Sequence, residues 1–365
     1  TNTTVLDALN LGRVVYITNS AVISISGLHL RQGSAINGGA VWVGNGVLTM
    51  TGNWVYSNTA TTNGGAVYNA GGEITLDDND LRSNQATNGG AFYHAGGTSL
   101  LQNNILRGNT ATNGGAIYNN ATALTVRHNT LYANSATNGG GFYTTNGTPT
   151  LVNNIFANNT ATTGHAVYGP LTSDYNDAYP AAGAYGGGAW PGDHSLAVDP
   201  RFVDAAGGDF HLQDNSPVID RGDPTMTLFH DFEGDLRPSN QGFDMGADET
   251  PGCRARILRE PGVIYGNVQL AIDHSIPGDV VQVTSDRECR GVHPFNTGSR
   301  IVSQTVHITH SLTLIGGYDS SFGSVISQTT LNPVAQGRAM LITDTAVVTV
   351  SNFLLTVTTA VSVIS

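Results

Sequence analysis

Acidic side chains that could act in acid–base catalysis are few in the first half of the sequence. Asp77, Asp78 and Asp80 fall in one short stretch, whereas a glycoside hydrolase needs two carboxyl groups about 5–9.5 Å apart in a groove. A polysaccharide lyase would use a Lys or Arg base, but the chain has no lysine, and Arg82 and Arg107 share one repeat position, as surface residues do. Ser-His-Asp and Cys-His nucleophile signatures are absent. The sequence therefore favours a non-enzymatic protein over a polysaccharide lyase or hydrolase.

One acidic stretch suggests a metal site. Asp231, Glu233 and Asp235 alternate beside a glycine, as in part of a calcium loop, although the twelve-residue EF-hand pattern is absent. Alternatively, these acids bond turn amides or pair with Arg221 and Arg237. Calcium is thus the only cofactor that the sequence suggests. Zinc spacing is absent from the histidines, which are spread singly: His94, His128, His165 and His211.

The two cysteines, Cys253 and Cys289, can pair or remain buried free thiols. An even count fits a disulfide, and an extracellular location would favour one. The sequence alone does not decide between the two states, and we expect the disulfide.

The net charge is concentrated in one segment. The 365 residues carry 27 Asp and Glu against 15 basic residues, all Arg, for a net charge of −12. Residues 172–250 hold 15 of the acids and three Arg, which accounts for the whole excess. The lack of a basic cluster argues against nucleic acid and anionic membranes as partners. No apolar run of helical character is long enough to span a bilayer.

An internal repeat dominates residues 34–170. Asn-Gly-Gly recurs with its Asn at positions 37, 63, 88, 113 and 138, in steps of 26 or 25 residues. Further columns keep this period, and two of them are aliphatic or aromatic: Val55, Leu81, Leu106, Leu131 and Phe156, and Met50, Leu76, Leu101, Val126 and Leu151. Each unit holds three short alternating apolar stretches, typical of strands, and no room for a capped helix of ten residues. The repeat therefore predicts a parallel β-helix with three strands per coil.

Stacking of the coils gives each column a physical role. Equivalent residues lie about 4.8 Å apart in successive coils, so aliphatic columns fill the core and Asn columns form ladders at the corners. Two Asn ladders are expected: Asn53, Asn79, Asn104, Asn129 and Asn154, and Asn58, Asn84, Asn109, Asn134 and Asn159. An aromatic column contains Tyr68, Tyr93, Tyr118 and Tyr143. It forms either a structural stack or a platform for sugars.

The repeated Asn-Gly-Gly-Ala-(Ile/Val/Phe)-Tyr, followed by Asn-x-x-x-x-Asn-x-Ala, resembles bacterial right-handed β-helix proteins of the polymorphic outer-membrane-protein type. The stretches 199–204, 216–220 and 244–249 are similar to the segment that closes many secreted β-helices, often before a surface anchor. The resemblance implies a right-handed, all-β fold, an extracellular or cell-surface location, and an adhesive or structural role.

A new unit begins after residue 252. Apolar spacing at Val268, Ala271 and Ile272 predicts one or two helical turns, and a strand follows at 280–283. This resembles the N-terminal cap of many β-helices, which protects the first strand edge, and Cys253 and Cys289 flank it. We therefore divide the chain into uncapped coils (1–171), an acidic closing segment with a linker (172–252), and the capped start of a second β-helix (253–365).

A longer repeat links the two β-helices. Residues 329–338 parallel residues 4–13, and the offset of 325 holds without a gap through Leu355 and Leu30. The chain is thus expected to contain one period of an array, with open coil edges that stack head to tail, and simple truncation is the alternative. The sequence favours a structural unit of an extracellular bacterial fibre or surface filament, with other copies of itself as partner. A cell-surface adhesin that binds glycans is the alternative.

Overall fold

The protein is described from a computed structural model covering residues 4–213, 215–239, 242–250, 252–285, 289–290, 293–296, 301–332, 338–343, 346–355 and 361–364. The chain forms two compact units. The first comprises Thr1–Met226, Asp231–Gly234 and Asp244–Glu249; the second comprises Thr227–His230, Asp235–Phe243 and Thr250–Ser365. The predicted closing segment therefore contributes to both units.

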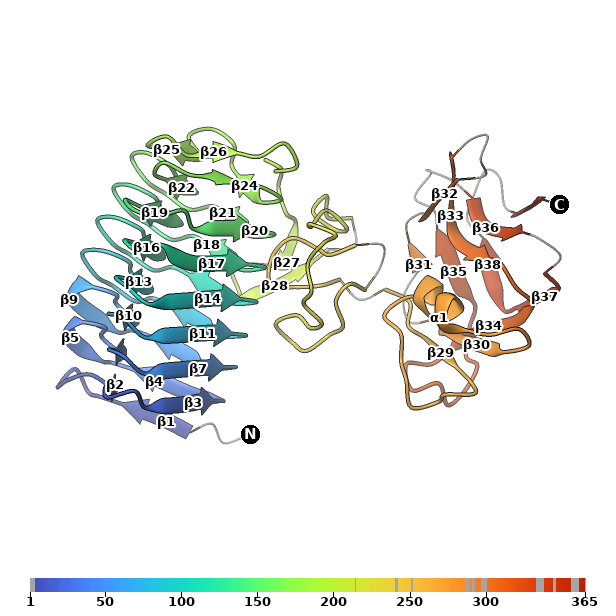
Figure 1. Ribbon diagram of the computed structural model, residues 1–365, viewed down its shortest axis with the longest axis horizontal. Coiled ribbons are helices and arrows are strands. Elements are labelled where there is room, and N and C mark those ends of the chain that lie inside the picture. The colour runs from blue at the N-terminus through green and yellow to red at the C-terminus, as the bar shows by residue number, and fades with distance from the viewer. Residues whose placement is uncertain are drawn as a thin grey trace. The chain divides into compact units, whose positions relative to one another are not determined.

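The first unit is a parallel β-helix, as the 25-residue period predicts, and it is right-handed, as the resemblance implies (Figure 1). Sheet A contains β1 (Thr4–Asp7), β4 (Leu28–Arg31), β8 (Trp54–Tyr56), β12 (Asp80–Arg82), β15 (Ile105–Arg107), β18 (Thr130–Tyr132), β21 (Ile155–Ala157) and β24 (Asp177–Tyr179). Sheet B contains β2 (Val15–Ile17), β6 (Val41–Val43), β10 (Val67–Asn69), β13 (Phe92–His94), β16 (Ile117–Asn119), β19 (Phe142–Thr144), β22 (Val167–Tyr168) and β25 (Tyr185–Gly186). Sheet C contains β3 (Val22–Ser26), β7 (Val47–Thr51), β11 (Glu73–Asp77), β14 (Thr98–Gln102), β17 (Ala123–Arg127) and β20 (Thr150–Val152). Smaller pairs are β5 (Ser34–Asn37) with β9 (Thr59–Asn63), β23 (Thr172–Ser173) with β26 (Trp190–Pro191), and β27 (Phe202–Asp204) with β28 (Asp209–Leu212).

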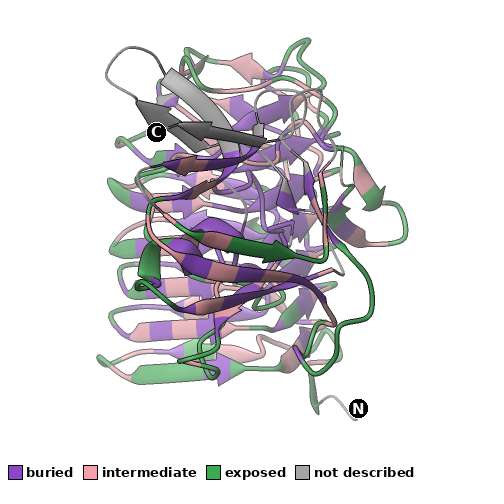
Figure 2. Cartoon of the chain, turned by 90° about the vertical axis from the view of Figure 1, so that its right-hand side faces the viewer, coloured by how far each residue is buried: buried purple, intermediate pink, exposed green. Residues whose placement is uncertain are grey.

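The predicted apolar columns fill the interior of the coils. Leu106 and Leu131 are fully buried and are paired at adjacent levels of sheet A. Leu76 pairs with Met50 on one side and Leu101 on the other in sheet C. Side chains alternate between the two faces of a strand, and Figure 2 shows the resulting alternation of buried and intermediate residues along the strands.

Buried asparagines form two continuous ladders inside the corners. Asn104 shows the pattern: its Nδ2 donates to Asn129 Oδ1 at 2.9 Å and its Oδ1 accepts from Asn79 Nδ2 at 3.0 Å. The same Nδ2 also donates to the carbonyls of Leu76 and Gln102. Each amide thus satisfies backbone groups of turns that are buried from water, which would otherwise carry a large desolvation penalty.

A third ladder occupies the Asn-Gly-Gly turns. It is partly exposed, and its amides donate toward the preceding coil: Asn63 Nδ2 to Asn37 Oδ1 and Asn88 Nδ2 to Asn63 Oδ1, each at 3.0 Å. The first glycine of the motif has a positive φ, such as +65° at Gly64. The second has no room for a Cβ atom, because at Gly65 it would collide with the carbonyl of the next coil. The motif therefore combines a left-handed turn with close coil stacking.

The acidic segment packs against the outer face of sheet A over its later coils. Ile105, Phe210 and Ala247 form one apolar cluster, and Ile155 and Met245 belong to another. The amide of Ala247 donates to the hydroxyl of Thr130 on β18 at 3.1 Å. The coils themselves continue past residue 171, since β24 pairs with β21 and β25 with β22.

The second unit is a shorter β-helix start with three sheets. They contain β29 (Ala255–Ile257), β30 (Val280–Thr284), β34 (Leu312–Tyr318) and β37 (Val348–Ser351); β31 (Cys289–Arg290), β35 (Thr329–Asn332) and β38 (Phe353–Leu355); and β32 (His293–Asn296), β33 (Ile301–Ile308), β36 (Arg338–Thr343) and β39 (Val361–Ile364). Its helix is α1 (Val268–His274), and no described helix is long and apolar enough to cross a membrane.

Helix α1 caps the second unit, as predicted. Asn267 begins it by accepting a hydrogen bond from the amide of Leu270 at 2.8 Å. Gln269 then pairs with the edge of β33 as a peptide group would: its Nε2 donates to the carbonyl of His307 at 3.0 Å, and its Oε1 accepts from the amide of that residue at 2.7 Å. The predicted disulfide joins Cys253 to Cys289, with 4.8 Å between the Cα atoms. Helix α1 thus satisfies a strand edge, and the disulfide attaches the stretch just before β29 to β31.

The 325-residue repeat has a structural counterpart. In the first unit Thr4 pairs with Leu28, and in the second unit Thr329 pairs with Phe353 in the same register. The strands β35, β36 and β37 correspond to β1, β2 and β3. Part of the matching stretch, residues 333–337, lies outside the described residues. The two units therefore contain the same coil, which β31, β33 and β34 cover in the second unit.

Candidate functional site

The predicted aromatic column runs along the outer face of sheet B. Successive rings of Tyr68, Tyr93, Tyr118, Tyr143 and Tyr168 lie 4.8–5.4 Å apart between centroids. At its lower end, Tyr16 stacks on Trp42 at 4.5 Å. Each ring covers a face of its neighbour, so the ladder presents ring edges and hydroxyl groups outward.

This stacking affects the phenol groups. Tyr93 is only 8% exposed, and its burial, together with the neighbouring Tyr118 and Tyr68, raises its pKa to about 12. Burial also raises the pKa of Tyr68 and of Tyr143. Sugars bind aromatic residues by stacking on an open ring face, and these faces are occupied by other rings. For Tyr68, Tyr93, Tyr118 and Tyr143, the geometry therefore favours a structural stack over a platform for sugars.

A second aromatic surface, unnoticed in the sequence, lies on the lower coils of sheet A. Trp54 is 43% exposed, and its ring lies between the imidazole of His29, with centroids 4.5 Å apart, and the guanidinium of Arg82, 4.5 Å from the ring centroid. Arg82 also lies 5.1 Å from the ring of Tyr56. Both faces of the indole are therefore covered, and the surface acts mainly as a cation–π contact between coils.

The acid cluster considered for catalysis is held by ion pairs. Asp80 Oδ2 accepts from Arg82 Nη1 at 3.0 Å and from Arg107 Nη2 at 2.9 Å. Asp77 Oδ2 accepts from Gln102 Nε2 at 2.9 Å. Arg82 and Arg107, expected as surface residues, thus link two coils through one buried carboxylate, an arrangement that suits structure better than proton transfer.

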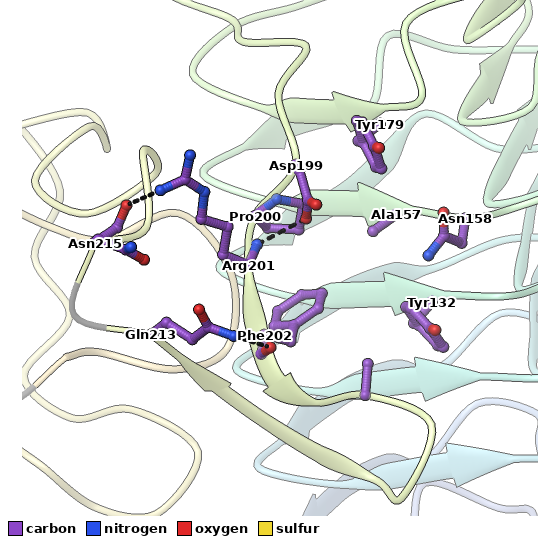
Figure 3. Close-up of a pocket in the computed structure, with 11 residues that line it drawn as sticks. Tyr132, Ala157, Asn158, Tyr179, Asp199, Pro200, Arg201, Phe202, Gln213 and Asn215 are labelled. Carbon is purple, nitrogen blue, oxygen red and sulfur yellow. Dashed lines mark hydrogen bonds between the residues drawn. The ribbon is translucent and has the colours of Figure 1, made fainter.

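A pocket of about 420 Å³ opens where the closing segment meets the last coils of sheet A (Figure 3). Its floor is an interrupted aromatic column: Tyr132 on β18, Ala157 on β21 and Tyr179 on β24. The small side chain of Ala157 leaves space between two tyrosines that are two coils apart. Pro200 and Phe202 of the closing segment form the opposite wall.

Planar polar groups complete this pocket. Arg201 Nη1 donates to the carbonyl of Asn215 at 3.0 Å, and the Arg201 amide donates to Asp199 Oδ1 at 2.9 Å. Gln213 Nε2 donates to the carbonyl of Phe202 at 3.0 Å. Tyrosine rings with fixed amide and guanidinium groups suit a small polar ligand with an apolar face, such as a sugar. In the sequence, this pocket is indicated only by a small residue, Ala157, between two tyrosines of the same column.

The residues of the predicted calcium site also have other contacts in the structure. Asp231 is fully buried, with Oδ1 accepting from the amide of Glu233 at 3.0 Å and Oδ2 from the amide of Glu249 at 2.9 Å. Its carboxylate thus bonds turn amides, as the alternative interpretation had it. Asp235 is exposed, and Glu233 lies near His211 and Asp248.

Comparison with known proteins agrees with the fold. A search of curated proteins with the sequence finds no match. Residues 13–176 match the profile of the family described as "Right handed beta helix region". The matched residues are the coils of the first unit, so sequence comparison and structure both identify this part of the chain as a right-handed parallel β-helix.

Proposed function

We propose that the chain is a structural unit of an extracellular fibre or surface filament, built by end-to-end stacking of β-helices. The observation that carries this proposal is the coil that occurs in both units in one register, Thr4 with Leu28 and Thr329 with Phe353. Because the coil of β1–β3 and the coil of β35–β37 are equivalent, a coil that stacks on one of them should also be able to stack on the other.

The lower edge of the first unit supports this proposal. β1, β2 and β3 are the edge strands of sheets A, B and C in the described part of the chain. Their coil exposes apolar side chains, among them Val22 at 78% and Leu11 at 87%. An exposed strand edge with apolar residues is a template for pairing.

The second unit offers a complementary edge. Among the described residues, β37, β38 and β39 are the last strands of their sheets, and β37 corresponds to β3 of the first unit. Pairing of one edge with the other joins different surfaces of two copies, and such heterologous contacts generate filaments when they do not close. An extracellular location fits the Cys253–Cys289 disulfide, since disulfides persist in oxidising compartments.

Electron microscopy and sedimentation at increasing protein concentration test the proposal. We expect rods that lengthen in steps of one chain. Val22→Lys should weaken association, because a charge on an edge strand opposes pairing. Glu73→Lys is the matched control, since Val22, Val47 and Glu73 share one column of sheet C but Glu73 lies on an inner strand. A chain that stays monomeric at high micromolar concentration would refute end-to-end assembly.

A second candidate function, glycan binding at a cell surface, is favoured by the pocket between Tyr132 and Tyr179. A glycan array probed with the whole chain tests it. Tyr179→Ala should abolish any binding in the pocket, whereas Tyr93→Ala and Tyr118→Ala should do so only if the tyrosine ladder is the platform. Absence of binding to every glycan would exclude this candidate for the glycans tested.

A further inference from the structure

Three separate stretches of the acidic segment bring metal-binding side chains together within the first unit. β28 contributes His211, the stretch Asp231–Gly234 contributes Glu233, and the stretch Asp244–Glu249 contributes Asp248. One ligand atom from each residue lies within 4.8 Å of the others. The cluster combines an imidazole with two carboxylates, and its members are up to 37 positions apart in the chain.

The imidazole is oriented for coordination. His211 Nδ1 bonds Asp209 Oδ1 at 2.6 Å, so Nδ1 carries the proton in the neutral ring and Nε2 holds the lone pair. Nε2 lies 3.8 Å from Glu233 Oε1. Histidines that bind metals commonly donate their second ring N–H to a carboxylate, which fixes the ring and its tautomer.

Backbone contacts hold the three stretches in place independently of any ion. The amide of Leu212 donates to Asp248 Oδ2 at 2.8 Å, and the amide of Phe232 donates to the carbonyl of Ala247 at 3.0 Å. The Asp231 carboxylate fixes the turn by accepting from the amide of Glu233. A site whose scaffold is already formed loses little conformational entropy when an ion binds.

We propose that His211, Glu233 and Asp248 bind a divalent transition-metal ion, with Zn²⁺ as the best match and Asp209 as the residue that orients the imidazole. One imidazole with carboxylates suits Zn²⁺, whereas Ca²⁺ takes oxygen ligands. Zinc–ligand bonds of about 2.0–2.2 Å place neighbouring donors roughly 3.3–3.6 Å apart. A small movement of the Glu233 side chain, which is 39% exposed, closes the present 3.8 Å to that separation.

The ion would cross-link the segment that packs on sheet A. It would also offset part of the negative charge of residues 172–250, where like charges oppose compaction. Zinc should therefore raise the melting temperature of the first unit, as any ligand that binds only the folded state does.

Calorimetric titration of the EDTA-treated whole chain with ZnCl₂ tests the proposal, with CaCl₂ as the comparison. We expect one zinc per chain and much weaker binding of calcium. His211→Gln and Glu233→Gln should each weaken zinc binding at least tenfold, and Asp209→Asn by about 10–100-fold. His194→Gln is the matched control, because His194 Nδ1 bonds Asp174 Oδ2 at 2.8 Å but the pair belongs to no three-ligand group among the described residues. Zinc affinity unchanged in His211→Gln, or tighter binding of calcium than of zinc, would overturn the proposal.

A measurement on the unaltered chain does not depend on the folding of any variant. Paramagnetic Co²⁺ should displace the NMR signals of one imidazole, and these signals should be missing from the His211→Gln spectrum. Zinc added afterwards should restore them. Co²⁺ shifts on another histidine, or on none, would show that the ion does not bind at His211.

Discussion

Two ionisable side chains, His94 and Asp177, are fully buried in the coils of the first unit. His94 lies between Asn69 and Asn119 in sheet B; its Nδ1 bonds Ser99 Oγ at 3.0 Å, and its Nε2 has no hydrogen-bond partner among the described residues. Asp177 Oδ1 accepts from the amide of Val198 at 2.9 Å, while Oδ2 has no partner in that part of the chain. Both groups are fully buried, so both favour their neutral forms.

Burial lowers the pKa of His94 from 6.5 to about 4. The unfolded chain therefore binds a proton that the folded chain excludes, and the first unit loses stability as the pH falls from about 6.5 to about 4. His94→Asn matches the residues above and below and removes this loss. Urea unfolding followed by tryptophan fluorescence at pH 5 and pH 7.5 should show a smaller pH effect in the variant than in the parent. Equal pH effects would contradict a neutral buried imidazole.

Asp177 should act in the opposite direction. Burial, reinforced by the charge of Asp199, raises its pKa from 3.8 to about 7. Its contribution to stability is thus present below about pH 4 and is lost as the pH rises to about 7, by at most about 1.4 kcal/mol per pH unit. Asp177→Asn should therefore gain stability relative to the parent as the pH rises through this range. Thermal melts at pH 5 and pH 8 measure the difference, and a constant difference would refute the shifted pKa.

At the scale of the elements, the corners of the coils are held by side-chain amides. The side chain of Asn104 makes five hydrogen bonds inside the first unit, to three coils in succession. Asn88, in the outer ladder, makes ladder bonds to Asn63 and Asn113 but is only half-buried. If an amide is removed, water can therefore take over its hydrogen bonds in the outer ladder more easily than in the inner ladder.

We expect Asn104→Ala to destabilise the first unit by at least about 2 kcal/mol, because it leaves buried carbonyl and amide groups without partners. Asn88→Ala, the matched control, should destabilise it by less than about 1 kcal/mol, since water reaches that ladder. Denaturant titrations of both variants give the comparison. Similar losses in the two variants would mean that the inner ladder is not the stronger one.

Most of the fold could be predicted from the period of 25 residues, because a column is visible in a sequence whenever its members share a chemical type. Leu106 and Leu131 could be placed in contact for this reason. The ladder member Asn176 was missed, since its coil is three residues shorter than the others. The pairing of Arg82 and Arg107 with Asp80 was also missed, because the partners differ in type and occupy different columns.

The acidic segment shows where such inference ends. Its residues have no period, so no register links position 211 to positions 233 and 248. Asp231, Glu233 and Asp235 alternate as ligands would, but the sequence gives no sign that His211 and Asp248 lie next to Glu233. Docking on sheet A depends on apolar residues of mixed type, such as Phe210 and Met245, that no pattern singles out.

At the scale of the whole molecule, the two units carry separate reporters of stability. All three tryptophans, Trp42, Trp54 and Trp190, lie in the first unit, whereas Cys253 and Cys289 lie in the second. Tryptophan fluorescence thus follows only the first unit. Unfolding of the chain is expected to proceed in two steps, each with its own free energy.

Reduction of the disulfide should destabilise the second unit by about 3–4 kcal/mol, since it opens a loop of 36 residues. Hydrogen exchange of residues 252–285 should rise on addition of dithiothreitol, while the tryptophan transition stays where it was. Cys253→Ser with Cys289→Ser should reproduce the effect without reductant. A tryptophan transition that moves with the disulfide would show that the two units unfold together.

The stacked coils also determine how the first unit would respond to force. Each coil adds about 4.8 Å along the axis but stores about 25 residues, which extend to roughly 80 Å when pulled out. Because each Asn amide bonds the coils before and after it, the loss of one terminal coil exposes the next. Under tension the unit would therefore lengthen in regular steps of one coil and would dissipate mechanical work at each step.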